Sequence, residues 1–129
     1  MLYVLDSTVL IDYLRGRPAV ERVEALHGRG DTPATTAINV EEIVRGLRDT
    51  EHDAARQLFA GLVVLPVDGR AGWQAGEWRR EHASRGVTLW QADCLVAATT
   101  LVAGAVLVSG NPKDFPTAEI EVVYWPVGE

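Results

Sequence analysis

The stretch LYVLDSTVLIDYLRG, residues 2–16, sets the architecture of the chain. It opens with a short run of apolar, aromatic and β-branched residues, which predicts a buried strand. Asp6 and Ser7 follow directly, and the apolar residues of VLIDYL then recur at helical spacing. Asp6 therefore stands where a strand ends and a helix begins, the repeating step of an α/β fold.

The same alternation continues along the rest of the chain. Further strands are predicted in ATTAI (34–38), LVVLPV (62–67), AVLVS (105–109) and EVVY (121–124). Helices are predicted from Pro18 to Gly28, from an Asn39 cap to Leu47, and over 51–60, 71–85 and 90–103. Strands separated by crossover helices pair in parallel. We therefore expect one domain over residues 1–129, a three-layer α/β/α sandwich with a central parallel sheet of about four to five strands.

Composition narrows the class of protein. The chain has 129 residues, enough for a buried core, and a single cysteine, Cys94, which excludes an internal disulfide. No apolar run is long enough to span a bilayer, and the first residues lack the basic leader of a signal peptide. We expect a cytoplasmic protein without a membrane partner.

The net charge of −6 argues at first against a nucleic-acid partner. The objection weakens if four carboxylates bind cations, because 14 acidic residues then face 12 basic ones. Bound metal also inverts the local field, so an acidic protein can still bind phosphate. Arg79, Arg80 and Arg85 lie on one predicted helix and could contact the phosphates of a nucleic-acid backbone, or could equally form a solvated basic face.

Four acidic residues stand at predicted strand ends and helix starts: Asp6, Glu42, Asp93 and Asp114. In a parallel sheet such positions meet outside the carboxyl ends of the strands. Carboxylates brought together repel one another unless a cation lies between them. Oxygen ligands without a Cys/His cluster favour Mg²⁺, with Mn²⁺ as a second possibility. We expect Ser7, Ser109 and Asn111 to support these carboxylates.

Each acidic residue also has a purely structural explanation. Asp6 could cap the first helix, and Glu42 could be the capping-box partner of Asn39. Asp93 lies in a first helical turn, where the helix dipole stabilises a carboxylate, and Asp114 could be an ordinary turn residue. Four independent caps have no reason to share one edge of the sheet, however, so the joint pattern favours a functional site.

The chain resembles the PIN-domain ribonucleases, and among them the VapC-type toxins of bacterial toxin–antitoxin pairs. The resemblance lies in four segments: VLDSTVLIDYLRG, TTAINVEEIVRG, QADCLVAATT and LVSGNPKDF followed by VVYW. They span almost the whole chain in the family's order. The chain departs from the family pattern at the fourth segment, where Asn111 holds a position that is often Asp and Asp114 follows three residues later. Either residue could serve there.

The resemblance implies a Mg²⁺-dependent endoribonuclease toxin of a type II toxin–antitoxin system. Such an enzyme cleaves tRNA or another structured RNA by metal-activated water. It implies Asp6, Glu42, Asp93 and Asp114 as catalytic metal ligands, a cognate VapB-type antitoxin, and a homodimer. One alternative is a catalytically weak PIN-like module that binds RNA or protein. A haloacid-dehalogenase-type phosphatase is disfavoured, because the first strand ends in D-S-T rather than D-x-D.

Overall fold

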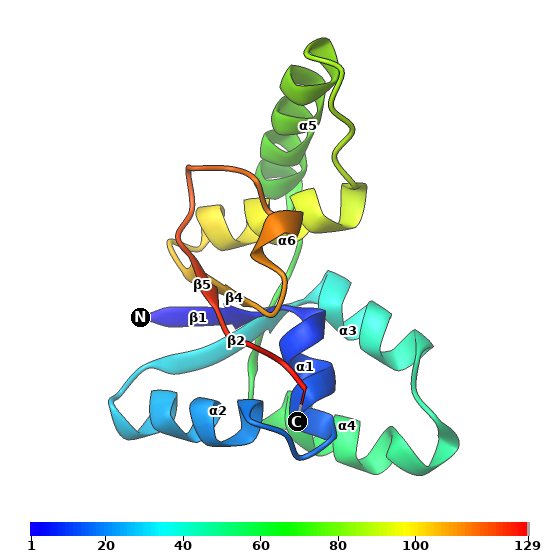
Figure 1. Cartoon of the computed structure of the whole chain (residues 1–129), viewed down its shortest axis with the longest axis vertical. Helices are drawn as coiled ribbons and strands as arrows, with labels where there is room; N and C mark the ends of the chain where they lie inside the picture. The colour runs from blue at the N-terminus through cyan, green and yellow to red at the C-terminus, as the bar shows by residue number, and fades with distance from the viewer. Residues whose placement is uncertain (129) are drawn as a thin grey trace.

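The protein, described by a computed structural model over residues 1–128, is a five-stranded sheet between two layers of helices (Figure 1). The strands are β1 (Leu2–Leu5), β2 (Thr32–Thr36), β3 (Val63–Leu65), β4 (Val106–Ser109) and β5 (Val122–Tyr124). Their order is β3-β2-β1-β4-β5, and every neighbouring pair is parallel. The predicted parallel sheet is confirmed, and EVVY does form an edge strand.

Helices cover both faces of the sheet. One layer contains α1 (Ser7–Leu14), α2 (Ala19–Gly28), α3 (Ala37–Arg45) and α4 (His52–Ala60), and the other contains α5 (Gly69–Ser84) and α6 (Gln91–Val102). Two short 3₁₀ turns complete the elements, η1 (Asp49–Glu51) and η2 (Pro112–Asp114). Helix α5 projects away from the sheet (Figure 1). No helix within residues 1–128 is long and apolar enough to cross a membrane.

The central strands are buried on both faces, as parallel strands between helical layers must be. Consecutive residues of a strand point to opposite faces, so Val4 packs with Trp78 of α5 while Leu5 packs with Leu10 of α1. Val4 and Leu5 are both fully buried. The two apolar layers fix β1 between α1 and α6, and thereby fix the position of the residue that follows it.

The main error of the prediction lies at the start of α3. Asn39 was expected to cap this helix, but the strand ends at Thr36 and the helix begins at Ala37. Thr36 is the cap: its hydroxyl accepts from the Asn39 amide at 3.4 Å, and the Asn39 side chain accepts from the Thr36 amide at 3.3 Å. This reciprocal capping box satisfies two otherwise unpaired amides. The other helices begin and end close to the predicted residues.

Candidate functional site

Five elements deliver polar side chains to the carboxyl edge of the sheet. Asp6 follows β1, and Ser109 ends the neighbouring strand β4. Glu42 lies on α3, Asp93 in the first turn of α6, and Asp114 at the end of η2. The topology thus brings the predicted residues from across the chain to one edge, where ligands of parallel α/β sheets bind.

Asp6 is 4% exposed and held by a ring of hydrogen bonds. Its Oδ1 accepts from the Thr8 hydroxyl at 2.5 Å and from the Val9 amide at 3.2 Å, and its Oδ2 accepts from the Ser109 hydroxyl. Burial raises the pKa of Asp6, while the bonds from Ser109, Thr8 and Val9 oppose that rise. Asp6 is therefore the cap of α1, as the structural explanation held, and also part of the carboxylate group. Its Oδ2 keeps one lone pair free for a further partner.

Glu42 joins the group through Ser7. The Ser7 hydroxyl donates to Glu42 Oε1 at 2.7 Å and accepts from Asn39 Nδ2 at 3.1 Å. Because Thr36 and Asn39 form the capping box between themselves, Glu42 is not its partner, and that structural explanation was wrong. The carboxylate that Ser7 contacts is thus Glu42.

Asp93 and Asp114 form the more open half of the group. Asp93 is half-buried and Asp114 is exposed, and both line one small recess with Leu89 and Phe115. Burial raises the pKa of Asp93 to about 6, helped by the negative charges of Asp114, Glu42 and Asp6. All three other carboxylates therefore act on Asp93 through space.

The fourth position is shared by two residues. Asn111 donates from Nδ2 to Asp114 Oδ1 at 3.1 Å, and its own amide donates to the Ser109 hydroxyl at 2.9 Å. The side chains of Asn111 and Asp114 thus touch each other beside the site, and both remain available there.

Carboxylate oxygens are the ligands that a hard divalent cation prefers, although the four carboxylates of residues 1–128 do not converge on one point. None of the four carboxylates forms an ion pair with Lys or Arg in the described part of the chain. Arg45 acts on Glu42 only through space, and mutual repulsion among the four carboxylates is the condition that Mg²⁺ or Mn²⁺ relieves. Yet within residues 1–128 no three His, Cys, Asp or Glu side chains converge closely enough to coordinate one ion.

The three arginines occupy different environments. Arg79 donates from Nε to the Leu89 carbonyl at 3.1 Å, and its positive charge reaches the Cys94 thiol, next in sequence to Asp93. Arg85, one residue past the end of α5, lies 3.8 Å from Glu81. Arg80 is exposed on the same helix. Of the three, Arg79 is the one whose charge is felt beside the carboxylates.

Thr8 and Asn39 add two further contacts to the site. Thr8 binds both Asp6 and the Gly110 amide, and Asn39, only 2% exposed, connects the start of α3 to Ser7. Asn39 was expected only as a helix cap, and its contact with Ser7 was not predicted. The signal for Asn39 was Thr36 three residues earlier, the spacing of a capping box.

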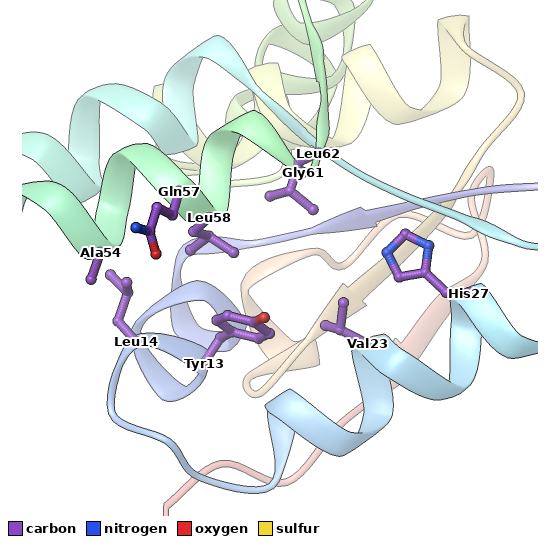
Figure 2. A pocket seen from close by; sticks show the side chains of 9 residues that line it. All are labelled: Tyr13, Leu14, Val23, His27, Ala54, Gln57, Leu58, Gly61 and Leu62. Carbon is purple, nitrogen blue, oxygen red and sulfur yellow. The ribbon is translucent and has the colours of Figure 1, made fainter.

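A separate pocket lies away from the carboxylates. It has a volume of about 280 Å³ between α1, α2 and α4, with Tyr13, His27, Gln57 and Leu58 among its lining residues (Figure 2). None of the four carboxylates lines it. The carboxylates lie instead at the carboxyl edge of the sheet.

Comparison with known proteins agrees with this geometry. A family model described as the PIN domain matches residues 3–120. Two curated relatives from Mycobacterium tuberculosis are named Ribonuclease VapC19 and Ribonuclease VapC10. The first is 30% identical and covers 88% of this chain and 91% of its own length; the second is 32% identical and covers 92% and 89%. The predicted resemblance is confirmed.

Solved structures share the fold. The chain superimposes on VapBC2 from Rickettsia felis bound to a promoter DNA fragment with a TM-score of 0.83 at 20% identity, covering 97% of this chain and 99% of that one. For DNA-bound VapBC from Salmonella typhimurium the TM-score is 0.84 at 23% identity, with the same two coverages. At these identities the likeness establishes architecture alone.

Proposed function

Because the chain belongs to the PIN domain family, we propose that it is a VapC-type endoribonuclease toxin that requires Mg²⁺ or Mn²⁺. The observation that carries the proposal is the gathering of four carboxylates at the carboxyl edge of the sheet, none of them ion-paired with a Lys or Arg of residues 1–128. Burial and the charges of the other three raise the pKa of Asp93 to about 6. A group of this kind would repel an RNA phosphate unless it held a cation. Its chemistry therefore supports a metal-dependent reaction on a phosphodiester.

We propose that Asp6, Glu42 and Asp93 hold the cation, with Asp114 or Asn111 completing the site. When bound, a divalent cation would lower the pKa of a water and stabilise charge on the phosphate. In the hydrolysis, a water oxygen bonds to phosphorus, the bond from phosphorus to the leaving oxygen breaks, and that oxygen takes up a proton. The protein contributes orientation: Thr8 and Ser109 fix Asp6, Ser7 holds Glu42, and the α6 N-terminus favours an ionised Asp93.

The substrate and partners follow from the same proposal. We propose tRNA or another structured RNA as substrate, with Arg79, Arg80 and Arg85 contacting its backbone from α5. The VapBC complexes of the same fold support a VapB-type antitoxin as partner. A homodimer and a cytoplasmic site of action are part of the same proposal. The single PIN-like domain would then extend over residues 1–129.

The direct test incubates purified protein with end-labelled tRNA in Mg²⁺ or EDTA. Glu42→Gln is the test variant, and Glu41→Gln is its matched control, because Glu41 is adjacent on α3 but exposed and paired with Arg45 at 3.0 Å. We expect Mg²⁺-dependent cleavage by wild type and Glu41→Gln, and none by Glu42→Gln. Cleavage in EDTA, or equal cleavage by both variants, would contradict the proposal.

The second candidate is an RNA- or protein-binding module with little catalytic activity. One observation favours it: the carboxylates of residues 1–128 do not yet converge on a common point. The same assay separates the two functions, because tRNA binding that persists in EDTA without any cleavage would support the module. Growth arrest on expression of wild type but not of Glu42→Gln, relieved by co-expression of a cognate antitoxin, would support the toxin.

A further inference from the structure

We infer that Asp12 and the C-terminal segment, residues 125–128, are positioning elements for Asp6. The segment follows the edge strand β5 and crosses to α1 and α2 (Figure 1). The inference rests on the proposed function in so far as the carboxylate they position is taken to bind a cation. Asp12 stands only six positions after Asp6, but its partners are the backbone amides of Ala19 and Gly128.

Asp12 is a buried anchor for two backbone segments. It is 2% exposed, and its Oδ2 accepts from the Ala19 amide at 3.0 Å while its Oδ1 accepts from the Gly128 amide at 2.8 Å. Ala19 is the first residue of α2, and the preceding Pro18 offers no capping side chain. Asp12 therefore caps α2 from a neighbouring helix and holds the C-terminal segment with its second oxygen.

Side-chain contacts of Arg22 hold the same segment. Its Nη1 donates to the Pro126 carbonyl at 2.6 Å, and its guanidinium carbon lies 6.0 Å from the centre of the Trp125 ring. Trp125 also packs against the core beneath α1 and α2, whereas Val127 is 41% exposed. The position of the segment therefore depends on these contacts and on the bond to Asp12.

The segment lies directly behind the hydroxyl groups that hold Asp6. A methyl group added at Gly110 would lie 2.7 Å from Cγ1 of Val127 and 3.0 Å from Oγ1 of Thr8, so no side chain fits between them. The Gly110 amide donates to Thr8 Oγ1 at 2.8 Å, and Thr8 in turn donates to Asp6. Val127 thus lies against Gly110, whose amide donates to the Thr8 hydroxyl.

The second hydroxyl is backed in the same way. The Trp125 amide donates to the Ser109 carbonyl at 2.9 Å, and the Ser109 hydroxyl donates to Asp6 Oδ2. Each side-chain donor to Asp6 is therefore linked to residues 125–128. Thr8 is linked through the Gly110 amide, which Val127 lies against, and Ser109 through its own carbonyl, which accepts from Trp125. If the segment detaches, Asp6 keeps its place in the fold but loses the restraint on its two oxygens.

The test uses three variants and a control. Asp12→Asn keeps the size of the side chain but leaves one of the two amides facing an NH₂ group. Val127→Ala removes the contact on Gly110 at a partly exposed position, so it does not threaten folding. Gly110→Ala introduces the clash with Val127, and the double variant Gly110→Ala/Val127→Ala relieves part of it. The control is Leu26→Val, a buried core change on α2 that takes no part in these bonds.

Two measurements are made on each protein. Mn²⁺ affinity is measured by calorimetry, and hydrogen exchange of the Val9 and Gly110 amides, which donate to Asp6 and Thr8, is measured by NMR without metal. We expect Asp12→Asn, Val127→Ala and Gly110→Ala to weaken Mn²⁺ binding about three- to tenfold, less than the about 10- to 100-fold effect of losing a direct outer-shell partner. Exchange of both amides should accelerate by more than the global loss of stability explains. The double variant should recover part of both losses, and Leu26→Val should lower only stability.

The outcomes separate this inference from the proposed function. Unchanged Mn²⁺ affinity and amide exchange in Asp12→Asn and Val127→Ala would overturn the positioning role and leave a purely structural anchor. If wild type binds no Mn²⁺, the proposed function fails, and the exchange of Val9 and Gly110 alone decides whether the segment positions Asp6. Equal effects from Leu26→Val would also overturn the inference, because general destabilisation would then explain them.

Discussion

The two halves of the carboxylate group differ in how completely the protein satisfies them. Asp6 is buried and accepts three hydrogen bonds, from Thr8, Val9 and Ser109. Asp93 is half-buried at the N-terminus of α6, and the charges that act on it come from other acids. Hydrogen bonds hold Asp6 in place in the folded chain, whereas Asp93 is exposed to repulsion from the other carboxylates. The contrast teaches that the protein fixes one ligand in advance and leaves the remaining charge for a cation to neutralise.

The sharpest way to break the contrast is to neutralise its fixed half. Asp6→Asn replaces one carboxylate oxygen with an NH₂ group and removes the charge that would bind the cation. A bound metal stabilises the transition state by several kcal/mol, so we expect its loss to lower kcat about 10³-fold. Single-turnover cleavage of tRNA measures this fall in rate. Activity within about tenfold of wild type would place the reaction elsewhere.

Removing a single donor to Asp6 should have a smaller effect. Ser109→Ala deletes the fully buried hydroxyl that donates to Oδ2 and leaves both of the bonds to Oδ1. We expect Mg²⁺ affinity to fall about 10- to 100-fold, with much of the activity restored at saturating Mg²⁺. The Mg²⁺ dependence of cleavage tests this expectation. The matched control is Thr100→Val, which deletes another fully buried hydroxyl, one that donates to the Val96 carbonyl within α6.

Asp93 is expected to lower the stability of the metal-free protein while it serves the proposed function. The Asp93 pKa is raised from 3.8 to about 6 in the folded protein, so the folded state holds this proton more tightly than the unfolded one. Stability is therefore lost as pH rises from about 4 to about 6, and the penalty is full above that range. Asp93→Asn should stabilise the metal-free protein at pH 7.5 by about 1 kcal/mol after allowance for solvent screening, or about 4 °C in Tm.

Thermal unfolding at pH 7.5 and pH 4 checks this prediction in EDTA. The gain should vanish at pH 4, where Asp93 is protonated in the folded protein. The variant should also lose cleavage activity while it gains stability. A destabilised Asp93→Asn protein at pH 7.5 would mean that the carboxylate has a favourable partner and that the two halves do not differ.

The smallest effect concerns the basic residues around the open half. Arg79→Gln should weaken tRNA binding by about 1 kcal/mol and reduce the salt dependence by about one ion, as expected for a phosphate contact. Arg85→Gln should do less, because Arg85 already lies near Glu81 and beyond the end of α5. Filter binding over a range of salt concentrations distinguishes the two variants. Equal effects would remove the reason for preferring Arg79.

The same contrast explains what the sequence could and could not predict. Asp6 and Asp93 were found because a strand end and a first helical turn are visible in local patterns. The parallel sheet followed from the alternation of elements and determined which edge they share. The contact between Ser7 and Glu42 joins residues 35 positions apart, and the one between Ser109 and Asp6 joins residues 103 apart. Such pairings depend on how helices pack, which spacing along the chain does not record.

Asp12 illustrates the same limit. It lies inside α1 and outside the carboxylate group, with both of its oxygens bonded to backbone amides. Its two partners, Ala19 and Gly128, come from α2 and from the end of the described chain. Only the folded arrangement brings the second of these against α1, so no local pattern could indicate it.

The most direct test of the account is a calorimetric titration of the protein with Mn²⁺ at pH 7.5, comparing wild type with Asp93→Asn. The account predicts saturable binding to wild type and an affinity at least about tenfold lower in the variant, because the open half supplies the charge that the cation neutralises. No binding to wild type, or equal affinity in both proteins, would contradict the claim that these carboxylates share a cation.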